Sequence, residues 1–489
     1  MLLLRSACRF IFQARTTHMR IQFIASLLLV GQLTAQPGAI DQSFNTGTGA
    51  GYDVRAVARQ ADGKILIGGG FSSFNGSTHH LLVRVGPDGG LDPGFADPGP
   101  ISGNIFCMAL QPDGKVLVGG DFSQFGGADR GGVARLNTDG SLDTGFNPGS
   151  GLGGNGVFLS DILVQPDGKL VLCGNFTQYN GAAHNCIVRV NADGSADASF
   201  LAGTGFDGIP AQLAAQTDGK ILVCGSFDTY NGTTRHGLVR LNPDGGLDGS
   251  LDPATGADAG IFSVQPLPSG KILIGGAFTH YDTFPSSHLA RVNADGSYDL
   301  LFYGMADGPD WDVDKILLQP NDKIIIAGGF TGYNGTSRHG VARLNNEGSL
   351  DLSFEPGNGI GSNHVFCAAL QPDGKIVLGG DFTTYDWNPA GHIVRVNGGE
   401  VIGVEELDGA GAPTVAPNPF SDRCAISFPQ RSALRGELLL SDLDGRLLRK
   451  LPIRADGTAV VERGALVPGP YLISGSSPAI AFHRVLVVE

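Results

Sequence analysis

The chain has 489 residues, a length that sets only a loose bound on the number of domains. With 76 glycines and only 16% charged residues, the composition suits short strands and tight turns and nearly excludes coiled coils and helical bundles. The net charge of -14 repels phosphate backbones and anionic lipid headgroups, which argues against nucleic acid as a partner.

Residues 1–35 have the layout of a secretory signal peptide. Four arginines precede an apolar run at residues 21–30, and Leu33-Thr34-Ala35 follows it. The run is about ten residues long, whereas a membrane span needs about 20. We therefore predict a leader that is cleaved after Ala35 and a mature protein without a transmembrane segment. A start at Met1 and a start at Met19 both remain open.

A lysine that follows a turn recurs every 51 to 54 residues after the leader. In every copy a phenylalanine stands seven residues after it, an aromatic residue ten after it and an arginine twenty after it. The lysines are Lys64, Lys115, Lys169, Lys220, Lys271, Lys323 and Lys375. The aromatic residues at the tenth position are Phe74, Phe125, Tyr179, Tyr230, Tyr281, Tyr333 and Tyr385. The arginines are Arg84, Arg135, Arg189, Arg240, Arg291, Arg343 and Arg395.

Each copy divides into four short strand-like runs separated by turn residues. A four-stranded unit repeated seven times predicts an all-β, seven-bladed β-propeller over residues 36–398, because each small sheet can bury its faces only against its neighbours. An open solenoid is the competing arrangement. An isolated fragment at Asp41–Phe44 precedes the first copy, while the last copy stops at Asn397 without its equivalent. We therefore predict that this fragment completes the seventh blade and closes the ring.

The spacing of the copies varies only in the Gly-rich stretch that joins one copy to the next, here called the link. Antiparallel strand order places the links on the same face as the loops that carry the recurring aromatic residue, and the Asp-Gly turns on the opposite face. Because binding surfaces usually arise on variable loops, we assign ligand binding to this link-and-loop face. Its tyrosine and histidine rings could hold a glycan or an acidic peptide, although a repeated loop-anchoring role is the favoured interpretation of the histidines. The candidate residues are Tyr179, Tyr230, His236, Tyr333, His339, Tyr385 and Trp311.

The repeated arginines allow two explanations. They could form an anion-binding ring, but the first six each lie eight residues before an aspartate, which makes the two cross-strand neighbours in a tight hairpin. A repeated structural ion pair is the favoured interpretation. The Asp-Gly turns themselves supply too few oxygens for calcium, so we predict neither a metal nor a cofactor.

The link before the sixth lysine is unusually acidic, with Asp307, Asp310, Asp312 and Asp314 around Trp311. An acid pair beside a tryptophan could serve sugar hydrolysis, whereas a solvated loop explains the same residues without chemistry. Six cysteines remain after the leader. Buried free thiols are favoured for them, and a Cys173–Cys186 bridge is left open.

The repeat resembles the delta-60 type, whose motifs stand here as QPDGK at residues 111–115 and ARLN at residues 342–345. The resemblance covers residues 40 to 398, and departures such as Ser269 and Glu347 affect only individual turns. It implies a propeller found in secreted bacterial proteins, and it provides no catalytic residues to transfer.

The periodicity ends at Asn397, and residues 399–413 have the composition of a linker. Residues 414–489 contain further strand candidates and predict a small β-sandwich. This domain resembles the type A sorting domain of the type IX secretion system. The residues that carry the resemblance are Pro417, Asn418, Pro419, Gly445, Gly469, Tyr471 and Arg484. It implies the secretion machinery as a partner and passage through the inner membrane and periplasm to the outer surface.

Together these features predict a secreted or cell-surface propeller that binds or adheres without catalysis and is exported through its C-terminal domain. Its ligand would be a glycan or a protein. A polysaccharide hydrolase or lyase that uses the acidic link at residues 307–314 is one alternative, and a purely structural surface component is another.

Overall fold

The computed structural model describes residues 36–302, 307–361 and 363–399, and stretches of the C-terminal region between residues 414 and 488. These stretches are 414–416, 421–427, 437–441, 447–454, 458–464, 466, 469–475 and 483–488. The predicted leader and nearly all of the linker lie outside the described residues. The described residues form strands and turns and contain no α-helix.

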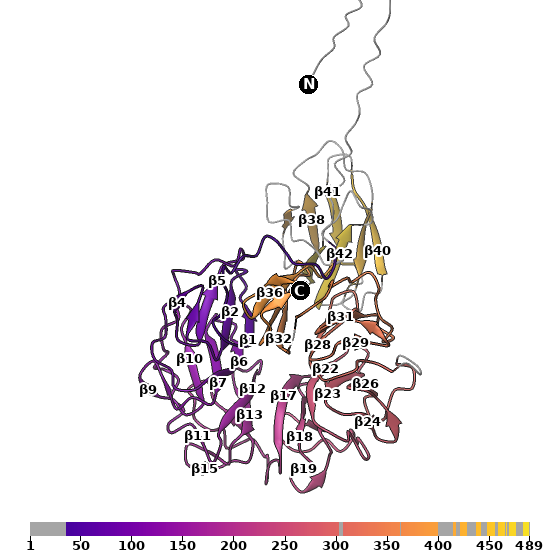
Figure 1. Ribbon diagram of the computed structural model, residues 1–489. Helices are drawn as coiled ribbons and strands as arrows, with labels where there is room; N and C mark the ends of the chain where they lie inside the picture. Colours follow the sequence, from indigo (N-terminus) through magenta and orange to yellow (C-terminus); the bar gives the residue numbers. More distant parts are fainter. Residues whose placement is uncertain are drawn as a thin grey trace, which may run out of the picture. The chain divides into compact units, whose positions relative to one another are not determined.

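Residues 36–399 form seven three-stranded antiparallel sheets, one for each copy of the repeat (Figure 1). The inner strands are β1 (Val54–Arg59), β6 (Ile105–Leu110), β12 (Phe158–Val164), β17 (Ile209–Ala215), β22 (Ile261–Pro266), β27 (Val313–Leu318) and β32 (Val365–Leu370). The middle strands are β2 (Ile65–Gly69), β7 (Val116–Gly120), β13 (Leu170–Asn175), β18 (Ile221–Ser226), β23 (Ile272–Gly276), β28 (Ile324–Gly328) and β33 (Ile376–Gly380). The third strands are β5 (Leu82–Val85), β10 (Val133–Leu136), β16 (Ile187–Val190), β21 (Leu238–Leu241), β26 (Leu289–Val292), β31 (Val341–Leu344) and β36 (Ile393–Val396).

The predicted fourth strand of each blade is present as a single bridged pair, such as Val85 with Leu91 and Leu136 with Leu142. The loop after each middle strand folds into a two-stranded ribbon, in which each strand has two residues. The ribbon strands are β3 (Ser73–Phe74) and β4 (Ser77–Thr78), β8 (Gln124–Phe125) and β9 (Ala128–Asp129), β14 (Gln178–Tyr179) and β15 (Ala182–Ala183), β19 (Thr229–Tyr230) and β20 (Thr233–Thr234), β24 (His280–Tyr281) and β25 (Phe284–Pro285), β29 (Gly332–Tyr333) and β30 (Thr336–Ser337), and β34 (Thr384–Tyr385) and β35 (Asn388–Pro389).

The links pair with these ribbons, as the strand order predicts. In the third link β11 (Leu152–Gly153) pairs with β14, and the other links each make one bridge to the equivalent ribbon residue. The loop asparagines also hold the links, since Asn180 accepts a hydrogen bond from the amide of Ser150, and Asn231 accepts one from that of Thr204. Each link is therefore tied to the loop of its own blade, although it begins beside an Asp-Gly turn, where the Ala96 amide donates to the Asp139 carbonyl.

The middle strands are buried on both sides because each sheet is covered by its two neighbours; all five residues of β2, for example, are buried. Each inner strand contacts the inner strands of both adjacent blades, and β1 contacts β32. The core between the first and last blades joins Val54 and Ile67 to Cys367 and Val377. The sheets thus form a closed ring and not an open solenoid.

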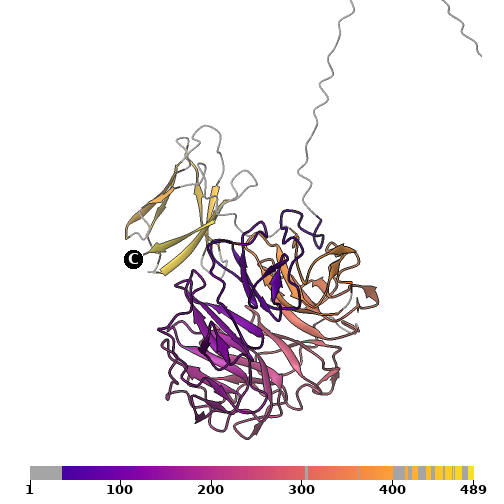
Figure 2. The same cartoon turned by 60° about the vertical axis from the view of Figure 1, so that its left-hand side comes forward.

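The N-terminal segment closes the ring, as predicted. Ile40 bridges Val396 of β36, and the Asp41 amide donates to the Arg395 carbonyl at 2.8 Å. The Asp41 carboxylate accepts from Arg395 Nε at 2.6 Å and from Lys375 Nζ at 3.1 Å. Figure 2 shows the indigo N-terminal segment beside the orange strands of the seventh blade.

A β-bulge near the start of every inner strand adds one residue where the chain enters from the link. The strands approach so closely there that a Cβ on Gly120 would lie 1.9 Å from the Asn104 carbonyl oxygen, which explains the Gly-Gly end of β7. The extra residues are Arg55, Phe106, Ser160, Ala211, Phe262, Asp314 and Phe366. The side chain at this position differs in chemistry from blade to blade, in contrast to the constant lysine and arginine of the repeat.

The C-terminal region contains two antiparallel sheets. One consists of β37 (Thr414–Ala416), β38 (Arg423–Ser427) and β41 (Thr458–Glu462). The other consists of β39 (Glu437–Ser441), β40 (Leu447–Pro452), β42 (Gly469–Gly475) and β43 (His483–Val488), in the order β40-β39-β42-β43. Both sheets contribute to one apolar core, which includes Ile426, Val461, Leu440 and Tyr471.

Candidate functional site

The repeated arginines are structural, as favoured from the sequence. In the second blade Asp143 Oδ2 accepts from Arg135 Nε at 2.7 Å and from Lys115 Nζ at 2.9 Å. The Arg135 guanidinium also lies 5.0 Å from the centre of the Phe146 ring. The hydrogen bonds outweigh the effect of burial and hold the pKa of Asp143 at about 2. The repeated lysine is thus the third member of an ionic cluster, which the sequence did not predict.

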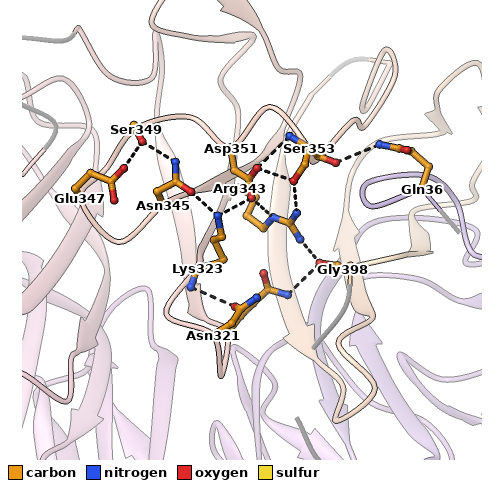
Figure 3. Close-up of polar contacts among 11 residues, drawn as sticks. Gln36, Asn321, Lys323, Arg343, Asn345, Glu347, Ser349, Asp351, Ser353 and Gly398 are labelled. Carbon is orange, nitrogen blue, oxygen red and sulfur yellow. Dashed lines mark hydrogen bonds and ion pairs between the residues drawn. The ribbon is translucent and has the colours of Figure 1, made fainter. Parts of the chain in front are cut away.

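Each arginine also reaches the next blade through Nη1, as Figure 3 shows for Arg343 and the Gly398 carbonyl. The same bond recurs around the ring. The acceptor carbonyls belong to Thr138, Ala192, Pro243, Ala294, Asn346, Gly398 and Pro87, the last of which binds Arg395 of the seventh blade. The arginines therefore staple each blade to its neighbour and do not form an anion-binding ring.

The four tyrosines assigned to the ligand face are not on it. Tyr179, Tyr230, Tyr333 and Tyr385 are fully buried. Each hydroxyl donates to the backbone carbonyl of a turn glycine, as from Tyr230 to Gly245 at 2.6 Å. The prediction that they contact a ligand is wrong, because these rings fill the space between the ribbon and the link that covers it.

The two histidines lie in separate hollows of the link-and-loop face. His236 is half-buried, with Nδ1 3.2 Å from Asp228 Oδ1, and lines a polar cavity of about 320 Å³ with Asp207 and Asp258. His339 lines another cavity of about 500 Å³, together with Asp307 and Asp310 of the acidic link. The structure thus does not gather the predicted residues into a single site.

The residues of the acidic link contact different partners and do not form one cluster of carboxylates. Asp310 caps a loop: its carboxylate accepts from the amides of Thr331 and Gly332 and from the Thr331 hydroxyl, which lowers its pKa although burial opposes the shift. Asp312 faces His288, with Oδ1 3.5 Å from Nδ1. Trp311 is 57% exposed, and its ring centre lies 6.5 Å from that of His288.

The most distinct cavity lies at the ring axis, where residues of four blades meet. It measures about 550 Å³ and is here called the axial cavity. Four bulge residues line it, together with Phe158 of β12 and residues from the second loop and the third link. The full lining is Arg55, Phe106, Asp121, Gly156, Val157, Phe158, Ser160 and Phe366.

Arg55 is held rigidly at this cavity. Its Nε donates to Asp53 Oδ2 at 2.6 Å, and the guanidinium carbon lies 5.3 Å from the Phe106 ring centre and 5.0 Å from that of Phe366. Phe106 meets Phe158 edge-on at 5.9 Å. The cavity therefore combines an aromatic wall with a fixed guanidinium.

A titratable pair adjoins the cavity. The His364 ring stacks on Phe366 with centres 5.9 Å apart, and its Nδ1 lies 3.1 Å from Asp314 Oδ2. Burial raises the pKa of Asp314, although the hydrogen bond from His364 opposes the shift. The same hydrogen bond raises the pKa of His364. The acidic link thus contributes Asp314 to the ring axis.

The sequence did contain a signal for the axial residues. Within a repeat of constant register, the second or third residue of the inner strand changes from arginine to phenylalanine, serine, alanine and aspartate. Inner strands of a propeller face its axis, so variation there marks the axial surface.

The C-terminal motif residues are only partly described. Pro417, Asn418, Pro419 and Gly445 lie outside the described residues. Gly469 and Tyr471 are in β42, where Tyr471 is buried in the apolar core, and Arg484 is in β43 opposite Ile473.

Cys107, Cys173, Cys186, Cys224 and Cys367 are buried free thiols, and no Cys173–Cys186 bridge forms; Cys424 is also buried. Burial raises the pKa of the Cys367 thiol to about 12. Within the described stretches, no group of three or more His, Cys, Asp or Glu side chains is arranged to hold a metal ion. No helix in the part of the chain that the structure covers has the length and hydrophobicity of a membrane span.

Comparison with solved structures finds distant propeller-like chains. A gluconolactonase from Xanthomonas campestris is 16% identical, with a TM-score of 0.35 over 58% of this chain and 82% of its own. YCF48 from Cyanidioschyzon merolae is 12% identical, with a TM-score of 0.36 over 71% of this chain and 96% of its own. A putative gluconolactonase is 13% identical, with a TM-score of 0.32 over 63% and 96%.

No curated protein matches the chain. A family model described as a β-propeller domain of unknown function, DUF5122, matches all seven copies of the repeat. The matched residues are 60–95, 111–146, 165–200, 216–254, 267–302, 319–354 and 371–398. Together they cover half of the chain, and the protein therefore belongs to the DUF5122 β-propeller family.

Proposed function

We propose that the protein is a secreted or cell-surface binding module whose propeller holds a glycan or protein ligand at the axial cavity without catalysis. One observation carries this proposal: three phenylalanines and a fixed arginine surround a cavity of about 550 Å³, a size typical of small-molecule sites. Most other recurring polar groups of the ring are engaged in holding blades, links and loops together, whereas the axial residues differ from blade to blade.

The acidic link gives less support to a glycan-cleaving enzyme. A glycosidase pairs a protonated carboxylic acid with a second carboxylate across the scissile bond. Asp310 is instead engaged by three donors of its own loop, and these lower its pKa, which is the wrong direction for a general acid. We therefore favour binding over turnover.

The binding proposal can be tested with the full-length chain on a broad glycan array. We expect saturable binding that Phe106→Ala abolishes. Phe262→Ala is the matched control, because Phe262 occupies the same bulge position in the fifth blade and is not part of the cavity lining. Loss of binding in both variants would contradict a site at the axial cavity. The absence of any saturable glycan or protein ligand would favour a purely structural surface component.

Export is the second part of the proposal. We infer that the C-terminal unit is a β-sandwich sorting domain read by the type IX secretion machinery, and that residues 1–35 direct the chain across the inner membrane. Two sheets with one shared core are consistent with a sandwich. We expect deletion of residues 414–489 to leave a folded propeller in the periplasm, detected by cell fractionation. Normal secretion of the deleted chain would refute the proposal.

A further inference from the structure

The axial cavity offers chemistry more specific than aromatic contact, and this inference rests on the proposed function. Arg55 Nε is engaged by Asp53, but within the described residues neither terminal nitrogen of the guanidinium has a hydrogen-bond partner. The Asp53 carboxylate is 5% exposed and fixes the guanidinium from behind, while Phe106 and Phe366 flank it. The side chain of Arg55 itself is 40% exposed. A fixed, accessible fork of N–H donors is suited to bidentate recognition of a carboxylate.

The remaining lining groups favour a ligand that carries hydroxyl groups and has an apolar face. The Ser160 hydroxyl has no hydrogen-bond partner among the residues that the structure describes, so it can both donate and accept. Asp121 accepts from the Asn104 amide and side chain, and its carboxylate has lone pairs left for a further donor. The aromatic wall attracts the weakly positive C–H groups on the face of a sugar ring.

We infer that the axial cavity binds a hexuronate residue of an acidic polysaccharide, with its carboxylate on the terminal nitrogens of Arg55, its hydroxyls on Ser160 and Asp121, and its ring against the phenylalanine wall. A fatty or aryl acid would offer no donor to the remaining lone pairs of Asp121. A neutral sugar would leave the arginine fork without an acceptor.

The first test compares ligands on the unaltered full-length chain. Oligogalacturonate and oligoglucuronate are titrated by calorimetry in 150 mM salt, each beside its methyl ester, which keeps the ring and hydroxyls but removes the charge. A peptide with a free C-terminal carboxylate is titrated beside its amide. We expect at least one uronate to bind roughly tenfold or more tightly than its ester.

Substitutions of Arg55 test whether the carboxylate of the ligand binds to this side chain. Arg55→Gln removes the fork, and we expect acid and ester to bind with equal affinity. Arg59→Gln is the matched control, because Arg59 lies in the same strand, outside the cavity lining, and its loss changes the net charge equally. Since Arg55→Gln leaves Asp53 unpaired, its melting temperature is measured, and Arg55→Lys provides a variant that keeps the charge but loses the bidentate geometry.

The outcomes separate this inference from the proposed function. Equal binding of uronate and ester by the unaltered chain would overturn carboxylate recognition while leaving glycan binding intact. Preference for the peptide acid alone would overturn the ligand class. Failure of every uronate to bind, with other glycans still bound and lost in Phe106→Ala, would overturn the inference but not the proposed site.

Discussion

At the scale of single residues, each repeated aspartate is held by two cations, and Asp143 illustrates what this contributes. Its pKa is about 2 because hydrogen bonds from Lys115, the Gly145 amide and Arg135 outweigh burial. We expect Asp143→Asn to lower the free energy of unfolding by about 3 kcal/mol at pH 7, since it leaves Arg135 without its buried partner. Urea denaturation measures the change.

The same residue predicts a pH dependence. Because the pKa is lower in the folded state, the stabilisation is complete above about pH 4 and is lost as the pH falls through 2. The difference between wild type and Asp143→Asn should therefore shrink in urea titrations near pH 2. Asp129→Asn, on an exposed ribbon, is the control and should have little effect at either pH. If wild type and Asp143→Asn differed in unfolding free energy by the same amount at both pH values, this explanation would be contradicted.

The buried tyrosines make a second prediction at this scale. Tyr230→Phe removes the hydroxyl that donates to the Gly245 carbonyl, and we expect a loss of about 1 kcal/mol in unfolding free energy with unchanged ligand binding. The loss should be modest because Phe74 and Phe125 occupy the equivalent position in the first two blades. If a fully folded Tyr230→Phe variant bound the ligand more weakly, Tyr230 would have to contribute to ligand binding after all.

At the scale of elements, the segment at residues 36–44 acts as the outer strand of the last blade. Its removal would leave Arg395 and Lys375 without Asp41, and the Tyr385 hydroxyl without the Gly38 carbonyl. We expect a loss of about 4 kcal/mol or more, measured as a lower urea midpoint. Gln36→Ala, which removes one exposed hydrogen bond to Ser353, is the control. An unchanged midpoint would contradict closure by this segment.

The sequence predicted elements better than surfaces. The seven blades and the closing segment follow from a repeat whose register tolerates insertions at only one place. The burial of the tyrosines could not be predicted, because the sequence of a Tyr-Asn-Gly turn is the same whether or not another segment crosses over it. Tyr179 pairs with Leu152 of the third link, which lies 27 residues before it, whereas the equivalent pair is 24 residues apart in five of the other blades.

The axial cavity escaped prediction for a related reason. Arg55, Phe106 and Phe366 belong to separate blades and meet only because the ring closes. The bulge that turns them toward the axis depends on a close approach of two backbones, which leaves glycine as its only trace in the sequence. Four of the seven variable bulge residues line the cavity, and the repeat itself does not distinguish them from the other three.

At the scale of the whole molecule, seven arginine staples join every blade to the next. Such a ring should open as one unit. We expect Arg135→Ala, in the second blade, to speed amide hydrogen exchange roughly a hundredfold in both β7 and the distant β23, because the loss of about 3 kcal/mol is shared by the whole ring. Mass spectrometry of peptides from both strands measures this. Acceleration confined to the second and third blades would show that they open independently.

The closing contact between Asp41 and Arg395 spans 354 residues of chain. The N-terminal segment of the propeller is synthesised before the last blade and can pair with Arg395 only after that blade has been made. A chain that is interrupted or clipped before the seventh blade cannot make this contact, however well its earlier blades fold. It retains an unpaired strand edge that is open to proteases and to other chains. Ring closure thus distinguishes complete chains from shortened ones, because only a full-length propeller can pair its first segment with its last blade.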